Sequence, residues 1–337
     1  MLQSFRSLAR AVVGTLALTT VALASEGWIA DYDEALKVAK AEHKDLFVDF
    51  TGSDWCGWCK KLDKEVFSHE EFLSEIKKDF VLVALDFPQK EEIKAKVPNP
   101  KRNDELRDLH GVGGYPTILL INTDGIAYAQ TGYMKGGPVK YVEHITDIKT
   151  KGRTALVEMK GLLDAWTKAT GEEKGKAWDK LLETFSAKSE ESRAAALLLP
   201  AIKEAMTFDK DNTAGRKLKA IEVLLKTGNM DDKILAEASA LDPKNEKGLM
   251  ERVVQAQFGK VHDDDSAKAA LDALDKLDAL GARKDKSVDF ELHVTAASWC
   301  AGPLDDKERA KKYATIAKAA GSDNKQALEM LDEILGS

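Results

Sequence analysis

Cysteine is scarce in this chain: its 337 residues include three, Cys56, Cys59 and Cys300. A small scaffold held together by disulfides needs several cysteine pairs, so that class of protein is excluded. Two of the cysteines are separated only by Gly57 and Trp58, and the third lies near the other end of the chain. The sequence therefore offers one close thiol pair and one separate thiol.

The chain also lacks a surplus of basic residues. It has 50 lysines and arginines against 57 aspartates and glutamates, which gives a formal net charge of −7. Phosphate binding usually requires a basic patch, so we do not expect a nucleic-acid partner. After residue 24 the sequence has no apolar run approaching the roughly 20 residues that span a bilayer, so we expect no membrane span in the mature protein.

The first 24 residues have the pattern of a secretory signal peptide. Arg6 and Arg10 precede the apolar run 11–24, which ends in a small-x-small cleavage pattern, Ala22-Leu23-Ala24. We expect cleavage after Ala24 and export to the periplasm or the extracellular space, where disulfides persist. The alternative is a membrane anchor, for which the run is shorter than the roughly 20 residues required.

Residues 25–150 alternate between strand and helix patterns. An apolar run rich in β-favouring residues precedes a turn, and the apolar spacing becomes helical from Cys56 onward. The sequence predicts strands at 46–50, 80–87, 117–121 and 126–131. Their alternation with helices is typical of an α/β sandwich. The polar segment 88–104 contains three prolines and is interpreted as an inserted loop, which either gates the substrate or, more simply, pads a connection.

Residues 151–337 differ in composition, since alanine, leucine, lysine and acidic residues dominate and helix signals recur. The segments 201–215 and 234–248 align at an offset of 33 residues, and a period near 34 suggests stacked helix pairs. The second segment resembles the end of a tetratricopeptide repeat, but the other signature positions are absent. We therefore predict an α-helical domain that is either repeat-like, possibly tetratricopeptide-like, or a plain bundle.

The pair Cys56 and Cys59 has the spacing of a redox dithiol. At a helix start, unpaired backbone N–H groups stabilise the thiolate of the first cysteine, which can then attack a substrate disulfide. The second cysteine, one turn further on, resolves the mixed disulfide, and Trp55 and Trp58 would form an apolar rim. A zinc site would need further ligands, and the six histidines are dispersed, so we expect no metal. A purely structural disulfide would close too short a loop to stabilise the fold much.

Three separated stretches resemble the thioredoxin superfamily: "LFVDFTGSDWCGWCKK", "GVGGYPTILLINTDG" and "YAQTGYMKGGPVKYV". They occur in the order of that family's active-site loop, cis-proline loop and last strand with terminal helix, and they cover roughly residues 30–150. The resemblance implies a thioredoxin-like sandwich with no cofactor beyond a redox-active Cys56–Cys59 disulfide.

The same resemblance implies roles for individual residues. Cys56 would attack, Cys59 would resolve, and Asp49 would be the buried acid that assists proton transfer from Cys59. Substrate would bind at Trp55, Gly57, Trp58, Tyr115 and Pro116, with Pro116 in the cis form. Two departures from the family pattern bear on these roles. Asp49 precedes Cys56 by seven residues across a slightly longer loop, and the Gly57-Trp58 pair replaces Gly-Pro, so the direction of electron flow does not carry over.

The sequence thus predicts an exported thiol–disulfide oxidoreductase that exchanges disulfides with protein substrates and needs a recycling redox partner. Its helical domain would recognise a protein partner or substrate. Two other functions stay open: a scaffold whose helical part does the work, and a metal chaperone that uses the dithiol. Cys300, beside Trp299, is expected to be a buried helix residue.

Overall fold

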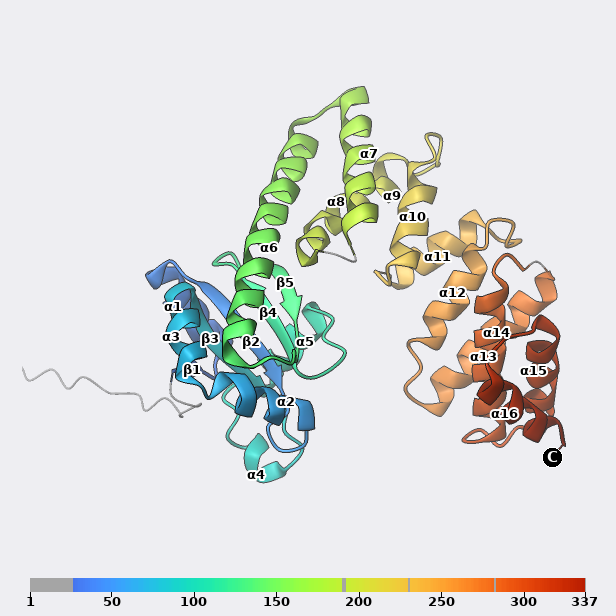
Figure 1. Cartoon of the computed structure of the whole chain (residues 1–337). Helices are drawn as coiled ribbons and strands as arrows, with labels where there is room; N and C mark the ends of the chain where they lie inside the picture. The colour runs from blue at the N-terminus through green and yellow to red at the C-terminus, as the bar shows by residue number, and fades with distance from the viewer. Residues whose placement is uncertain (1–26, 190–191, 230, 282, 337) are drawn as a thin grey trace, which may run out of the picture. The chain divides into compact units, whose positions relative to one another are not determined.

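The computed structural model describes residues 27–189, 192–229, 231–281 and 283–336, so the expected signal peptide lies outside it. These residues form two compact units (Figure 1). One unit ends at Glu158 and also takes in Ser192–Ala194, and the other holds the remaining described residues. No helix within these ranges is both long and apolar enough to cross a membrane.

The first unit is built on a five-stranded sheet with the strand order β1-β3-β2-β4-β5. β1 and β2 each run parallel to β3, whereas β4 is antiparallel to both β2 and β5. The strands are β1 (Trp28–Ile29), β2 (Asp45–Thr51), β3 (Phe80–Asp86), β4 (Thr117–Ile121) and β5 (Ala127–Thr131). The four strands predicted from the sequence correspond to β2, β3, β4 and β5, and a thioredoxin-like α/β domain followed by helices is confirmed.

Both faces of the sheet are covered by packed side chains. Successive side chains of β2 point to opposite faces, so alternate residues of this strand pack into two different clusters. Leu46, Val48 and Phe50 pack with α1 (Tyr32–Glu42) and with Leu106 of α5 (Pro100–Leu109) in one apolar cluster. Phe47 contacts the rings of four aromatic residues from β1, β3, η1 (Asp63–Phe67) and α3 (Glu70–Asp79): Trp28, Phe67, Phe72 and Phe80. Tyr141 of α6 (Gly137–Lys168) packs against two of these rings, Phe67 and Phe72. Asp49, two residues after Phe47, therefore belongs to this second face.

The expectation of a loop at 88–104 was wrong. The segment contains the short helix α4 (Glu91–Lys94), and α5 (Pro100–Leu109) begins inside it. The prolines favoured a loop, but Pro100 stands at the start of α5, where its missing N–H and fixed φ fit a helix. Asn99, the residue before it, has φ −136° and ψ 67°, which lie outside the α region that a following proline disfavours.

The rest of the chain is helical. α6 (Gly137–Lys168) runs unbroken past residue 150, where we expected the domain boundary, and is followed by α7 (Gly171–Lys188). The remaining helices are η2 (Arg193–Leu198), α8 (Leu199–Lys203), α9 (Ala205–Phe208), α10 (Arg216–Lys226), α11 (Asp232–Leu241), α12 (Leu249–Phe258), α13 (Asp264–Leu280), α14 (Lys286–Ala301), α15 (Lys307–Ala320) and α16 (Lys325–Gly336).

The two segments that align at an offset of 33 residues take the same local structure. Asp209 and Asp242 each end a helix and accept backbone N–H groups at the start of the next helix, α10 or α12. The paired asparagines have φ angles of 53° and 55°, and the paired glycines that precede α10 and α12 have φ angles of 73° and 81°. The repeat in the sequence therefore encodes a repeated turn between helices, in which glycine supplies the left-handed conformation.

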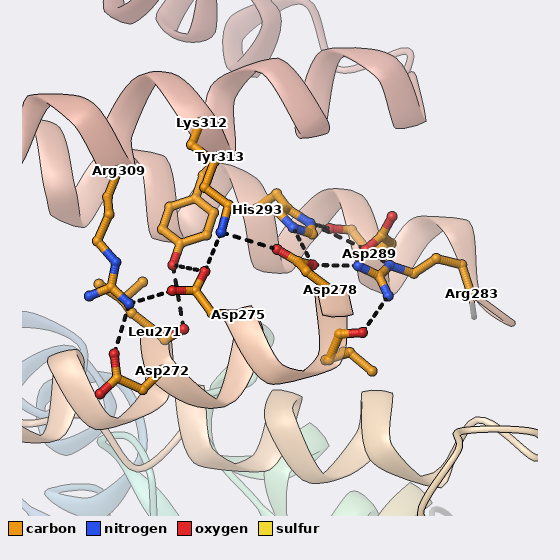
Figure 2. A network of polar contacts seen from close by, with 11 residues as sticks. Leu271, Asp272, Asp275, Asp278, Arg283, Asp289, His293, Arg309, Lys312 and Tyr313 are labelled. Carbon is orange, nitrogen blue, oxygen red and sulfur yellow. Dashed lines mark hydrogen bonds and ion pairs between the residues drawn. The ribbon is translucent and has the colours of Figure 1, made fainter. Parts of the chain in front are cut away.

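A network of charged side chains joins α13, α14 and α15 (Figure 2). Asp275 of α13 accepts hydrogen bonds from Lys312 at 2.6 Å and from the Tyr313 hydroxyl at 2.8 Å. His293 of α14 is fully buried and lies 3.1 Å from Asp278 and 3.2 Å from Asp289. Burial opposes a charge on His293, but the two carboxylates outweigh it and raise its pKa to about 9.

This pKa predicts that the second unit loses stability as the pH rises. Protonated His293 is stabilised in the folded state, so its contribution is complete below pH 6.5 and is lost between pH 6.5 and about 9. Across that window the difference in unfolding free energy between wild type and His293→Gln should shrink by roughly 3 kcal/mol. Urea unfolding followed by far-UV circular dichroism measures this, with exposed His262→Gln as the control. A constant difference would contradict the prediction.

Candidate active site

The dithiol lies where β2 leads into α2 (Gly57–Leu62). Cys56 and Cys59 form a disulfide, and each is 5 % exposed. Cys56 is the N-cap of α2, and its sulfur accepts the backbone N–H of Cys59 at 3.1 Å. After reduction, the same N–H group and the helix dipole would favour the thiolate of Cys56 over that of Cys59.

The loop before β4 contributes a cis proline. The peptide bond between Tyr115 and Pro116 is cis, and both residues are half-buried. The Thr117 hydroxyl donates to the Gly114 carbonyl at 2.8 Å and closes the turn. A Cβ atom on Gly132, which follows β5, would lie 3.0 Å from the Pro116 carbonyl oxygen, so glycine avoids a tight contact with the cis-proline loop there.

On one side of the dithiol, the ring of Trp55 is held by neighbours. Its indole N–H donates to the Phe87 carbonyl at 2.8 Å, and its ring meets that of Tyr115 edge-on, with centroids 5.5 Å apart. A Cβ atom on Gly52 would come within 2.6 Å of the Trp55 ring, which explains the glycine in this loop. The side chain is nevertheless 41 % exposed.

On the other side, Trp58 is 58 % exposed and packs against Tyr133, with ring centroids 5.0 Å apart. The ammonium of Lys61 lies 5.1 Å and 5.0 Å from the centroids of these two rings, a cation–π arrangement. Tyr133 also donates to Glu65 at 2.7 Å. Trp58 was predicted from the sequence as a site residue, whereas Tyr133, which is 75 residues further along the chain, was not. Gly57 is exposed, and an added Cβ would meet no atom within 4 Å, so packing does not require glycine there.

Asp49 lines a cavity of about 210 Å³ together with Cys59. Exposed side chains on the same wall include Ser53, Lys60 and Asp63, so the lining extends from the surface to the buried acid. The lining also includes apolar side chains such as Trp28 and Phe67, and a cavity of this volume is large enough for several water molecules. Asp49 is 7 % exposed, and its Oδ1 has no hydrogen-bond partner among the described residues.

The environment of Asp49 favours the protonated acid. Burial raises its pKa to about 8, and the charges of Asp63 and Asp86 act in the same direction. The pKa of Asp63 is itself raised by partial desolvation. The cavity therefore brings a buried carboxyl group to the side of Cys59, and an acid with such a pKa can exchange a proton near neutral pH.

The third thiol is separate from this site. Cys300 is a fully buried residue of α14, as expected from the sequence, and burial raises its pKa to about 11. Among the residues that the structure describes, no group of three or more histidine, cysteine or acidic side chains is arranged to hold a metal ion.

The sheet and the Cys56–Cys59 pair at a helix start define a thioredoxin-like thiol–disulfide oxidoreductase. The thioredoxin-like domain family matches residues 32–144. The disulfide bond reductase DsbH of Chlamydia pneumoniae is 34 % identical over 125 residues, which cover 37 % of this chain and 74 % of the relative. The chain belongs to this thioredoxin-like family that includes DsbH.

Two further comparisons are partial. The thioredoxin-related protein DsbJ of Chlamydia pneumoniae is 33 % identical over 99 residues, which are 28 % of this chain and 27 % of DsbJ. A solved structure described as DsbH oxidoreductase is 31 % identical, and the match covers 43 % of this chain and 94 % of that chain, with a TM-score of 0.33. The reported alignments with DsbH and DsbJ each span well under half of this chain.

The raised pKa of Asp49 predicts a stability gain on its removal. The folded protein retains a proton that the unfolded chain releases, so stability falls as the pH rises from 3.8 to about 8. Asp49→Asn should stabilise the oxidised protein at pH 8 by roughly 3–5 kcal/mol and have little effect below pH 4. Urea unfolding at both pH values tests this, with exposed Asp147→Asn as the control. Equal stabilities at pH 8 would contradict it.

The charge of Asp63 should have a measurable effect on the pKa of Asp49. Asp63→Asn removes a negative charge that raises the pKa of Asp49, so that pKa should fall, whereas Asp63→Glu keeps the charge and should leave it near its wild-type value. Carbon-detected NMR titration of the Asp49 carboxyl group in the oxidised protein reports the pKa directly. An unchanged pKa in Asp63→Asn would show that Asp63 is not electrostatically coupled to Asp49.

Proposed function

We propose that this protein is an exported reductase of protein disulfides. The observation that carries the proposal is the disulfide at the start of α2, where the sulfur of Cys56 already accepts a backbone N–H. The reducing direction is supported by the relative described as a disulfide bond reductase. Export is supported by the pattern of residues 1–24.

The reaction would proceed in two exchange steps. The thiolate of Cys56 attacks one sulfur of the substrate disulfide, forms a mixed disulfide and releases the other substrate sulfur as a thiolate, which takes up a proton. The ionised form of Asp49 then takes the proton of Cys59, and the Cys59 thiolate attacks the Cys56 sulfur. The enzyme disulfide forms and the second substrate thiol leaves, so two electrons pass from enzyme to substrate. A separate dithiol partner would reduce Cys56–Cys59 again, and no further cofactor would be needed.

The surroundings of the dithiol suit a peptide substrate. Trp55 and Trp58 present exposed aromatic surface on either side of the disulfide, and Gly57 between them leaves room for approach. The backbone of Tyr115, before cis Pro116, would pair with the extended substrate segment. The helical unit would recognise the substrate or the recycling partner.

The reduction potential of the Cys56–Cys59 pair tests this proposal. We expect a reversible two-electron transition near about −270 mV, in the range of a reductant, in glutathione buffers and followed by tryptophan fluorescence. Trp55 and Trp58 flank the pair and should report the change, and Cys56→Ser should abolish it. A potential of about −120 to −180 mV would overturn the reducing direction. Without any reversible transition, the enzymatic function would fail and a helical binding protein would become the leading hypothesis.

A further inference from the structure

The cavity beside the dithiol has two acidic residues in its lining, and they lie at different depths. Asp49 is 7 % exposed, and its Oδ1 has no hydrogen-bond partner among the residues that the structure describes, whereas Asp63 is exposed. Both share the lining with Cys59. One cavity therefore joins the second cysteine of the dithiol, a buried carboxyl group and a carboxyl group at the surface.

Helix geometry places Asp63 on the same side of α2 as Cys59. The backbone N–H of Asp63 donates to the carbonyl of Cys59, which is the hydrogen bond of a regular α-helical turn. Residues four apart on a helix are neighbours on one face, in agreement with the presence of both side chains in the cavity lining. The helix that carries the dithiol thus also fixes the position of the outer carboxyl group.

The basic residue of the lining, Lys60, is engaged elsewhere. Its ammonium group donates to the backbone carbonyl of Asp54 at 2.7 Å. The carboxylate of Asp54 in turn accepts the backbone N–H of Gln89 at 3.0 Å and that of Lys90 at 2.8 Å, so the loop that holds Lys60 is itself tied down. Within the described ranges, Lys60 forms no ion pair with either acid of the cavity. The two carboxyl groups are therefore left to exchange protons.

The second exchange step requires such a transfer. When ionised Asp49 takes the proton of Cys59, it must release that proton before it can act as a base again. Its burial limits direct contact with bulk water. Asp63 is partly desolvated, which raises its pKa and makes its carboxylate a better proton acceptor than that of an ordinary surface aspartate. Water in a cavity of about 210 Å³ can bridge the two groups.

We propose that Asp63 carries the proton between Asp49 and the solvent while Cys59 resolves the mixed disulfide. Protonated Asp49 gives its proton through cavity water to the Asp63 carboxylate, which releases it to bulk water, and no electrons move in this transfer. Asp63 acts through Asp49 and does not touch the reacting sulfurs, so it is a positioning residue for the proton. The inference rests on the proposed function and adds to it the route by which the proton leaves.

Single-turnover reaction of the reduced, reductant-free full chain with neutral 4,4′-dithiodipyridine separates the two exchange steps. The first release of thiopyridone reports attack by Cys56 and depends on the reagent concentration, whereas the second reports attack by Cys59 and does not. Near neutral pH, Asp63→Asn should slow the second phase about tenfold and leave the first within about twofold of wild type. Asp63→Glu keeps a carboxyl group in place and should restore most of the rate.

A purely electrostatic role of Asp63 would act with the opposite sign. The charges of Asp63 and Asp86 both raise the pKa of Asp49, so removing either one increases the ionised fraction of Asp49 near neutral pH. That change cannot by itself slow the second phase. Asp86 is absent from the cavity lining and accepts hydrogen bonds from Ser53. Asp86→Asn is therefore the matched control, and its second phase should be as fast as that of wild type or faster.

Chemical rescue provides an independent measurement. Asp63→Ala leaves space where the carboxylate stood, so added acetate should speed its second phase in proportion to the acetate concentration and leave that of wild type unchanged. The inference would be overturned by an unslowed second phase in Asp63→Asn, by equal slowing of both phases, by equal slowing in Asp86→Asn, or by failure of acetate to rescue Asp63→Ala. Each of these results leaves the proposed function intact. A wild-type protein without any second phase would instead overturn the proposed function.

Discussion

The pairing of β2 with a neighbour on each side holds the active site together. Asp49 lies opposite Ala84 of β3 and Ile118 of β4, so its position along the sheet is fixed from both directions. A slip of one residue would move the carboxyl group to the other face, away from the cavity that it shares with Cys59. The apolar side chains before and after it oppose such a slip, because all of them would exchange faces together.

The same register has an electrostatic consequence. It places an ionisable group among apolar neighbours and within reach of the charges of Asp63 and Asp86. The fold gives up stability to keep this acid buried, and in return holds beside Cys59 a carboxyl group whose pKa of about 8 lets it bind and release a proton near neutral pH. Local instability of this kind is characteristic of functional sites.

Much of the first unit could be predicted because short stretches of the sequence determine its strands and the position of its dithiol. The strand at 117–121 and the dithiol at a helix start follow from short patterns in the sequence. What escaped prediction depends on contacts between distant residues: Tyr133 beside Trp58, and Asp54 bonded to a segment 35 residues away. The helices within 88–104 were missed because proline was interpreted as a breaker, although at the first turn of a helix it is favoured. In the second unit, the aligned aspartates and glycines predicted repetition, and the structure supplies its cause in a turn that is built twice.

The burial of Cys300 simplifies the chemistry of the entire chain. A thiol that is fully enclosed in α14 and protonated at neutral pH neither reacts with disulfides in solution nor competes with Cys56 for a substrate. The native protein therefore behaves as a two-electron reagent although it has three sulfhydryl-bearing residues. Alkylation of the folded, reduced protein at neutral pH should therefore count Cys56 and Cys59 alone, and unfolding should add Cys300 as the third equivalent.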